Sequence, residues 1–429
     1  MTQLATIALD PALLRMAGAL ATELADALAS PPPLEPDGDR SPTSPRWRGQ
    51  SLSKGAAGIA VLHGIRAHTG HGPWNRAHAW LACANREELS AGPGAGLWFG
   101  AGSLAFALSV AAPPGQYRTA QSALDAAVAT MTRSRLEAAA ARMTAGVRPA
   151  LAEFDLVRGL TGLGAYWLRR DPGGPLIRDV LTYVVRLCQP LPASDPAGRN
   201  VPGWWTNDVP SGQDPETFAR GWSDQGMAHG IAGPLSLLAM TKRTGITVPG
   251  QIEAMERICQ WLDIWRQDSP AGSWWPERLT LAELHAGHSQ QGGPARPSWC
   301  YGTPGITRST MLTALALGDT ARQDAAEDAL ARCLADPAQL RRLTNPAICH
   351  GLAGVLATCW YAAADARTPA LAAHLPNLLQ ALLREHTTSA QSPAWQQPGL
   401  VEGTAGVALT LHSIATASSG GWPTCLLID

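Results

Sequence analysis

A short pattern recurs along this chain: a polar stretch, two glycines three residues apart, and then a run of small apolar residues of helical length. Such a period is typical of folds built from repeated supersecondary units. Glycine at a turn permits close backbone approaches that a side chain would prevent. The second instance is degenerate, since Ser103 stands where the later glycine would fall. The first glycines of the seven instances are Gly55, Gly100, Gly159, Gly230, Gly302, Gly351 and Gly403.

The segments between these turns place apolar residues at helical spacing with polar residues between them, which predicts amphipathic helices. The alternation of polar and apolar residues that is typical of β-strands is hardly visible. An outer helix, a turn and an inner helix in each repeat predict an all-α fold in which seven helical hairpins form a ring. We expect outer helices over residues 74–89, 121–139, 176–187, 252–265, 321–333 and 368–383.

The first part of the chain differs from the repeats. Residues 1–29 carry charged side chains through an apolar run, which predicts an amphipathic helix rather than a signal peptide. Residues 30–45 are rich in proline and therefore unsuited to a helix. We expect residues 1–47 to form an N-terminal helix and connector, and residues 48–429 to form the helical-ring domain.

Two of the gaps between turns are long and rich in proline, glycine and tryptophan: residues 190–225, with Trp204-Trp205, and residues 268–298, with Trp274-Trp275. Long loops in a compact domain are usually binding loops or lids. Two interpretations stay open. The tryptophan pairs are exposed and contact a peptide or another extended ligand, or they simply pack in the interior.

Composition narrows the classes of function. The formal net charge of the 429 residues is −1, and no basic run is present, which argues against nucleic-acid or membrane-surface binding. No uninterrupted apolar run reaches the roughly 18 residues that a membrane span needs. The eight cysteines are scattered without a repeated spacing, which indicates a reducing compartment rather than a disulfide framework. We expect a cytoplasmic protein.

Three candidate metal ligands stand just before two of the glycine turns: Cys300 before one, and the adjacent Cys349 and His350 before another. Thiolate and imidazole are ligands that zinc prefers, and three protein ligands leave a position open, as in catalytic sites. The plainer interpretation is that each cysteine is a small core residue. Adjacent residues on a helix point about 100° apart, so the pair can share an ion only if a turn carries it.

Seven helical hairpins with Gly-x-x-Gly turns, together with Trp299-Cys300-Tyr301-Gly302 and Cys349-His350-Gly351, resemble the lanthionine synthetase C family, the stand-alone lanthipeptide cyclases of class I systems. The resemblance covers residues 51–412. It implies an α/α toroid, a double ring of helices around one zinc ion. It also implies closure of thioether rings by Michael-type addition of peptide cysteines to dehydroalanine or dehydrobutyrine.

The same resemblance implies the ligands and the partners. Cys300, Cys349 and His350 would hold one zinc ion per chain, and the substrate sulfur would take the open position. The partners would be a dehydrated precursor peptide and, beyond it, a lanthipeptide dehydratase and an exporter. We expect a monomer.

Four further residues match the acid–base and enolate positions of the family. His229 would act as the acid or base, and Asp155 matches the acidic position. Arg296 would pair with Asp155 or hold the developing enolate oxygen, and the hydroxyl of Tyr301 would either donate to the enolate or pack. Without the family, His229 is a hydrogen-bonding or capping residue and Asp155 is a helix N-cap. His285 and His288 form a competing pair, which we interpret as loop residues.

Three other functions compete with a cyclase. A related zinc protein could couple glutathione or another small thiol to dehydrated peptides at the same site. A non-catalytic scaffold could bind a peptide or a dehydratase through the tryptophan-rich loops. A helical-ring glycosidase is the weakest alternative, because that chemistry relies on paired carboxylates.

Overall fold

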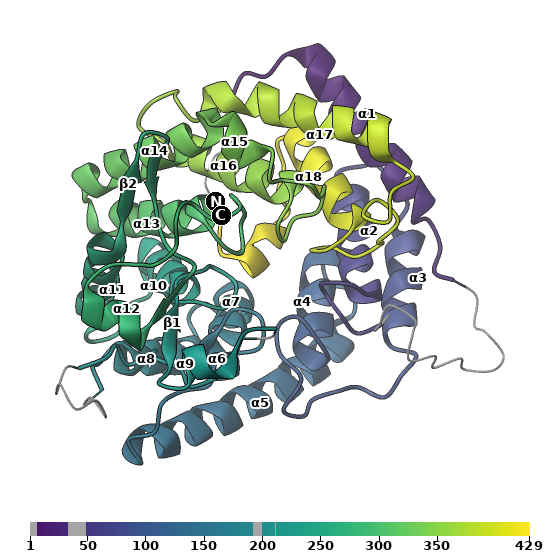
Figure 1. Cartoon of the computed structure of the whole chain (residues 1–429). Helices are drawn as coiled ribbons and strands as arrows, with labels where there is room; N and C mark the ends of the chain where they lie inside the picture. Colours follow the sequence, from purple (N-terminus) through teal and green to yellow (C-terminus); the bar gives the residue numbers. More distant parts are fainter. Residues whose placement is uncertain (1–6, 33–48, 192–199, 211) are drawn as a thin grey trace. The chain divides into compact units, whose positions relative to one another are not determined.

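The computed structural model describes residues 7–32, 49–191, 200–210 and 212–429 (Figure 1). Helices dominate this part of the chain, and an inner helix follows every one of the seven glycine turns, as predicted. The inner helices are α2 (Ala56–His68), α4 (Ala101–Ala111), α7 (Leu160–Arg170), α10 (Ala232–Arg243), α13 (Thr303–Leu317), α16 (Leu352–Asp365) and α18 (Thr404–Thr416).

A second set of helices alternates with the inner set along the chain. These outer helices are α1 (Pro11–Ala27), α3 (Trp74–Ala84), α5 (Arg118–Thr144), α8 (Pro175–Leu187), α11 (Gln251–Trp265), α14 (Thr320–Ala335) and α17 (Leu375–Ser389). Short helices fill connections: α6 (Leu151–Phe154), α9 (Pro215–Phe218), α12 (Leu281–Ala286), α15 (Pro337–Leu340) and the 3-10 turns η1 (Ala372–His374) and η2 (Trp422–Leu426).

The last outer helix starts later than the predicted segment 368–383, at Leu375. Pro376 explains the difference, because proline lacks a backbone N–H and fits only the first turn of a helix. The preceding residues form the 3-10 turn η1 instead. Burial also separates the two sets of helices. α2 buries every residue from Ala56 to Arg66, whereas α17 buries five leucines and exposes its opposite face.

In six of the seven turns the second glycine lies against the backbone carbonyl six residues earlier. A Cβ atom on Gly305 would collide with the Trp299 carbonyl, and one on Gly354 with the Ile348 carbonyl. The polar stretch before each inner helix therefore folds tightly over the first turn of that helix. In the second repeat this place belongs to Gly102, against the Gly96 carbonyl, so Ser103 leaves the close approach intact.

The chain divides into two compact units. Unit 1 comprises residues 1–128, 344–360 and 375–422, and unit 2 comprises residues 129–343, 361–374 and 423–429. In unit 1, α1 packs along α18, and α2 contacts α3 and α4 (Figure 1). In unit 2, α13 contacts α10 and α14, and α10 also contacts α7 and α11. The domain boundary expected at residue 47 stays a prediction.

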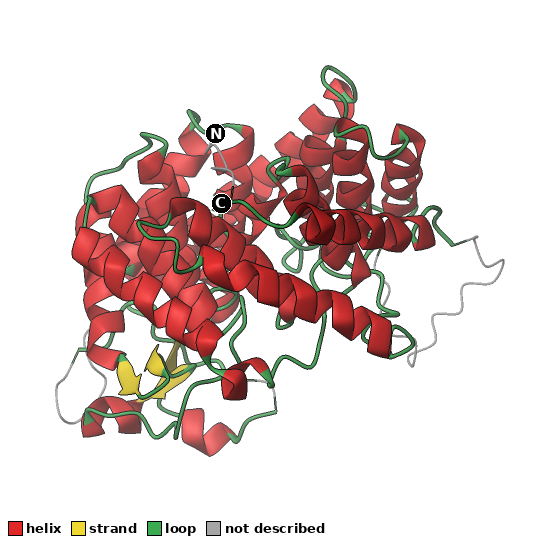
Figure 2. Ribbon diagram, turned by 90° about the horizontal axis from the view of Figure 1, so that it is seen from above, coloured by secondary structure: helices red, strands yellow, loops and turns green. Residues whose placement is uncertain are grey.

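The two long gaps between turns, residues 190–225 and 268–298, are called the insertions below. Four short strands lie in them or at their start, and the sequence did not predict these strands (Figure 2). β1 (Trp222–Asp224) pairs antiparallel with β4 (Arg278–Thr280), and β2 (Gln267–Ser269) pairs antiparallel with β3 (Gly272–Trp274). One strand of the β1–β4 pair comes from each insertion. The two insertions therefore fold together as a single structural element.

Both tryptophan pairs are interior residues. Trp204 and Trp205 are 1% and 0% exposed, and Trp274 and Trp275 are 7% and 5% exposed. Trp205 belongs to a hydrophobic cluster that spans the two insertions. Of the two interpretations of these pairs, packing is confirmed, and exposed peptide-binding tryptophans are wrong.

The segment 426–428, at the end of η2 and just after it, packs into unit 2. Leu426, Leu427 and Ile428 are 1% exposed or less. The indole N–H of Trp299 donates to the Leu426 carbonyl at 3.0 Å, and Nε of the buried Arg308 donates to the Ile428 carbonyl at 2.8 Å. This segment thus supports the residue that precedes Cys300. Across the described ranges, no helix combines the length and apolar character that a membrane crossing requires.

Candidate active site

Cys300 lies in a tight turn that leads into α13, in unit 2. Ser298 closes the turn, because its backbone N–H and its hydroxyl both donate to the Tyr301 carbonyl, at 3.0 and 2.7 Å. Gly302 follows with φ of 90°, a left-handed conformation that favours glycine. The Cys300 side chain is buried, and its Sγ lies 3.5 Å from Ser298 Oγ. The turn presents this thiol at the N-terminus of a long helix.

Cys349 and His350 lie in a turn before α16, in unit 1. The backbone N–H of Cys349 donates to the Val401 carbonyl at 2.8 Å, and the N–H of Leu352 donates to the Asn345 carbonyl at 2.9 Å. Both candidate ligands are half-buried. Because neither residue is inside a helix, the divergence of adjacent helical side chains does not apply to them.

His229 is paired with Asp155 within unit 2. His229 Nδ1 lies 2.7 Å from Asp155 Oδ2, and the Asp155 side chain is fully buried. The other oxygen, Oδ1, accepts the backbone N–H groups of Arg158 and Gly159 at 2.5 and 2.8 Å. Asp155 therefore holds the turn before α7 with one oxygen and orients an imidazole with the other. The N-cap residue of α7 is Gly159, so the N-cap interpretation of Asp155 is wrong, and its acid–base role stays a prediction.

Opposing effects set the pKa of His229. Burial lowers the pKa of an imidazole, whereas the hydrogen bond to Asp155 and the charges of Asp155 and Asp224 raise it. On balance the pKa of His229 lies above its usual value of 6.5. The balance of these effects favours the protonated imidazole more than in a free histidine.

A second buried carboxylate, which the sequence analysis missed, holds Tyr301. The Tyr301 hydroxyl donates to Asp224 Oδ2 at 2.9 Å, and the Gly226 N–H donates to Asp224 Oδ1 at 2.8 Å. Burial raises the pKa of Asp224 to about 6, against the lowering effect of its hydrogen bonds and of nearby His229 and Arg278. Burial also raises the pKa of Tyr301, and the charge of Asp224 adds to this effect.

Arg278 was missed as well, and its guanidinium lies 5.9 Å from the centre of the Tyr301 ring. The sequence signal for Asp224 is its position five residues before His229, ahead of a glycine. Arg278 had no comparable signal, since its place depends on the pairing of β4 with β1.

Backbone hydrogen bonds join the loops of this site. The Cys300 carbonyl accepts the N–H groups of Met227 and Ala228 at 3.0 and 3.4 Å, and the Ala228 carbonyl accepts the Leu156 N–H at 3.1 Å. The rings of His229 and Tyr301 lie with their centres 6.5 Å apart. The structure therefore brings Asp155, His229, Cys300 and Tyr301 together in one region of unit 2.

Arg296 lies outside these hydrogen bonds. It is exposed on the loop before Cys300, and the arginine beside Asp155 is Arg158, whose Nε lies 3.8 Å from Asp155 Oδ2. The role of Arg296 stays a prediction. His288 is exposed in the loop after α12, as predicted, whereas His285 is half-buried inside the last turn of α12, so its assignment to a loop is wrong.

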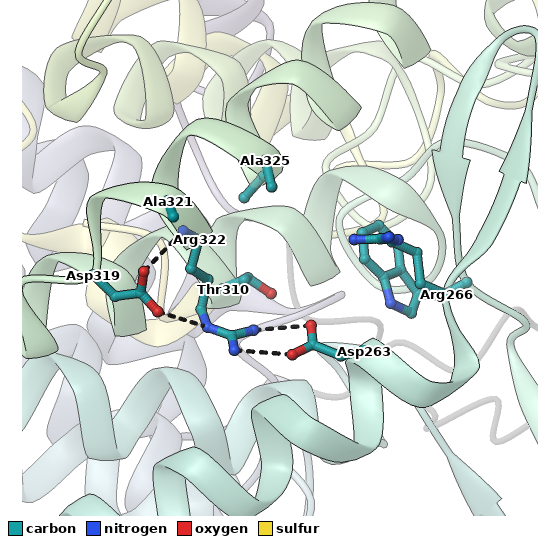
Figure 3. A pocket seen from close by; sticks show the side chains of 9 residues that line it. Asp263, Arg266, Thr310, Asp319, Ala321, Arg322 and Ala325 are labelled. Atoms are coloured by element: carbon teal, nitrogen blue, oxygen red, sulfur yellow. Dashed lines mark hydrogen bonds and ion pairs between the residues drawn. The ribbon is translucent and has the colours of Figure 1, made fainter.

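A pocket lies among α11, α13 and α14, and Asp263, Thr310 and Arg322 are among the residues that line it (Figure 3). Arg322 donates to both carboxylate oxygens of Asp263 at 2.9 Å and lies 3.3 Å from Asp319. Its charge is therefore paired. None of the predicted site residues lines this pocket.

The observed features define a class of protein: an all-α fold of helical hairpins opened by glycines, with an aspartate–histidine pair beside a buried cysteine turn. The family model described as lanthionine synthetase C-like protein matches residues 46–427. The chain belongs to this family.

The chain is also similar to two individual proteins. The nisin biosynthesis protein NisC of Lactococcus lactis subsp. lactis is 24% identical over 210 residues, which are 48% of this chain and 48% of NisC. The alignment thus spans about half the length of that relative. The structure of nisin cyclase matches with a TM-score of 0.73 and 17% identity, covering 98% of each chain. This likeness confirms the predicted fold class, an all-α toroid.

Proposed function

We propose that this chain is a zinc-dependent lanthipeptide cyclase. It would form lanthionine and methyllanthionine rings by Michael-type addition of peptide cysteine thiols to dehydroalanine or dehydrobutyrine. One observation carries the proposal: His229, paired with Asp155 at 2.7 Å, lies on a loop that is hydrogen-bonded to the Cys300 turn. An acid–base group thus accompanies a candidate metal ligand within unit 2. Membership of the lanthionine synthetase C-like family supports the same class of reaction.

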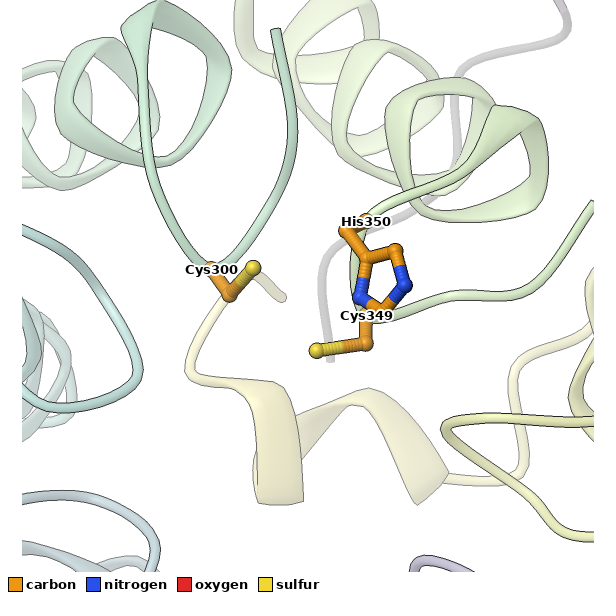
Figure 4. A group of neighbouring side chains, drawn as sticks. All are labelled: Cys300, Cys349 and His350. Carbon is orange, nitrogen blue, oxygen red and sulfur yellow. The ribbon is translucent and has the colours of Figure 1, made fainter. Parts of the chain in front are cut away.

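The proposed ligands of the zinc ion are Cys300, Cys349 and His350, with one ion per chain. Each side chain offers one ligand atom, and Figure 4 draws the two loops that carry them. Two sulfurs and one imidazole nitrogen are a donor set that suits zinc. Three protein ligands leave a fourth position for the substrate. A bound zinc ion would supply Lewis acidity that favours the thiolate form of a substrate cysteine.

The reaction adds a thiol across a carbon–carbon double bond, so sulfur joins the β-carbon and a proton ends on the α-carbon. Asp155 accepts a hydrogen bond from His229 Nδ1, which fixes the imidazole and leaves Nε2 for the substrate. As a base, Nε2 takes the thiol proton. As an acid, it delivers a proton to the α-carbon of the enolate. The Asp155 carboxylate stabilises the imidazolium between these transfers.

We assign Arg296 to the enolate oxygen, where a guanidinium would stabilise the negative charge that develops during the addition. Tyr301 borders the same region beside His229. The substrate would be a dehydrated precursor peptide, and a dehydratase and an exporter would be further partners. We assign the reaction to the cytoplasm and to a monomer whose cyclase domain spans residues 48–429.

The proposal is tested with synthetic peptides that carry one cysteine and one dehydroalanine at different spacings. Ring closure removes the free thiol without a change in peptide mass, so alkylation followed by mass spectrometry measures it. Wild-type protein should close rings faster than the uncatalysed reaction and contain about one zinc ion per chain. Zinc-loaded protein that leaves every peptide open to alkylation would refute the proposal.

Cys349→Ala should lose most of the zinc and the activity. Cys259→Ala is the matched control, because Cys259 is a buried free cysteine on α11 that is no proposed ligand. This control should keep its zinc. A separate incubation with glutathione and a dehydroalanine peptide that lacks cysteine addresses the alternative function, and a fast adduct there would favour a small-thiol transferase.

A further inference from the structure

Asp224 occupies a position that both long insertions build. It ends β1, directly opposite Arg278 of β4. The buried Trp204 supports this strand pair, since its indole N–H donates to Ser223 Oγ at 2.9 Å. Two insertions, a strand pair and buried tryptophan thus converge on one carboxylate beside Tyr301.

The Asp224 carboxylate is fixed in place. Its oxygens accept the Tyr301 hydroxyl at 2.9 Å and the Gly226 N–H at 2.8 Å, and the side chain is almost fully buried. A Cβ atom on Gly230 would collide with Asp224 Oδ1. The charged or titratable groups around Asp224 are His229, Arg278 and Tyr301. A buried carboxylate with two donors at these distances is held in one orientation.

A phenol has a single proton and can donate only one hydrogen bond. In this structure the Tyr301 proton is directed to Asp224, so the Tyr301 oxygen has only lone pairs for another partner. It can accept a hydrogen bond from an N–H or S–H group of a substrate. It cannot also donate a proton to an enolate while Asp224 is ionised.

We propose that Asp224 is a positioning residue for Tyr301: by holding the phenolic proton it makes the Tyr301 oxygen an acceptor and leaves proton delivery to His229. The inference rests on the proposed cyclase function and deepens it. It excludes the first role expected for Tyr301, donation to the enolate, because a tyrosine that donates to the enolate would need its proton free.

A double-mutant cycle of Asp224→Asn and Tyr301→Phe tests this inference. The Asn amide can donate to the Tyr301 oxygen and reverse the hydrogen bond, so the kcat for ring closure should fall about 10- to 100-fold with little change in KM. Tyr301→Phe should cause a similar loss. The double variant should be no worse than either single variant, because Asp224 acts through Tyr301. Multiplied losses would overturn the inference.

Asp328→Asn is the matched control, since Asp328 is exposed on α14 and pairs with Arg332. It should leave the rate unchanged. Zinc content and melting temperature of all variants identify any loss that comes from misfolding. A variant that keeps its zinc content and its melting temperature and still has a lower kcat is folded, so its loss of kcat does not come from misfolding.

A readout without activity separates this inference from the proposed function. The chain has five tyrosines, so labelling the tyrosine ring carbon that bears oxygen with carbon-13 gives few resonances. Tyr301→Phe identifies the Tyr301 resonance by its absence. Asp224→Asn should shift it, and an unchanged resonance would overturn the inference. If wild-type protein closes no ring, the proposed function falls, and the shift still decides whether Asp224 holds Tyr301.

Discussion

Asp155→Asn tests the acid–base pair closely, because the substitution keeps the shape of the side chain and changes what it donates. The amide oxygen of Asn can accept the same N–H groups of Arg158 and Gly159 that Asp155 accepts at 2.5 and 2.8 Å. The amide nitrogen would then face His229 Nδ1 and donate to it. The imidazole must move its hydrogen to Nε2, the atom that should take the thiol proton.

The expected loss of turnover is about 10²–10⁴-fold, the range for removing a general base or for holding it in the wrong tautomer. His229→Asn should cause a loss of the same size. Both variants should keep their zinc, because neither residue is a proposed ligand. The defect should appear in kcat rather than in KM.

The pair also predicts a pH-dependent difference in stability. The pKa of His229 is raised in the folded chain, so the folded chain binds the His229 proton more tightly than the unfolded chain does. That contribution is fully present below the unfolded value of 6.5 and is lost as pH rises through the folded pKa. Asp155→Asn removes it. The loss of unfolding free energy in the variant should therefore be larger at about pH 5.5 than at about pH 9.

Urea unfolding at the two pH values measures this difference, and alkylation followed by mass spectrometry measures turnover. Asp171→Asn, at the other end of α7, is a control for the loss of one carboxylate. Wild-type turnover in Asp155→Asn would refute the role of the pair in catalysis. A stability loss that grows with rising pH would refute the pKa argument even if turnover fell.

Three further predictions concern the fold. Gly305→Ala should cost about 1–3 kcal/mol of unfolding free energy, because the new Cβ would meet the Trp299 carbonyl. Gly292→Ala is the control, since a Cβ there meets nothing within 4 Å, and thermal unfolding should show no change in its stability. Trp204→Ala should cost about 3–5 kcal/mol and leave the KM of the correctly folded fraction unchanged, contrary to a peptide-contacting tryptophan. The pKa of Asp224 is raised from 3.8 to about 6. Its contribution to the free energy of unfolding is therefore present below pH 3.8 and is lost as pH rises through about 6. Urea unfolding should therefore show Asp224→Asn gaining stability relative to wild type across that window.

Much of the fold could be predicted from the sequence because the glycines of the repeat are required sterically. In six of the seven turns a side chain at the second glycine would strike the carbonyl six residues earlier, so the glycine itself marks the start of the helix. Helix periodicity marked the outer helices, and the late start of α17 at Leu375 follows from Pro376. The strand pairs escaped prediction because three-residue strands are too short to show alternation.

The candidate site could be predicted only in part. His229 and Asp155 stand in recognisable motifs and pair at 2.7 Å, whereas the catalytic roles that the resemblance implies for them stay predictions. Asp224 and Tyr301 are 77 residues apart, and their contact depends on how the insertions fold. The tryptophan pairs show a further limit, because composition does not reveal whether an aromatic side chain is exposed or buried.

The Cys300 carbonyl links the two halves of the proposed chemistry. It accepts N–H groups from Met227 and Ala228, directly before His229, while the thiol of the same residue is a proposed metal ligand. A shift of this turn would therefore move the imidazole and the ligand together. The Trp299 indole, held by the Leu426 carbonyl, restrains the turn from its other side. The insertions then have a structural reason to be long, because together they bring Asp224 and Arg278 to Tyr301. The tryptophan pairs are occupied by packing within the fold, so the proposed peptide substrate would contact other residues.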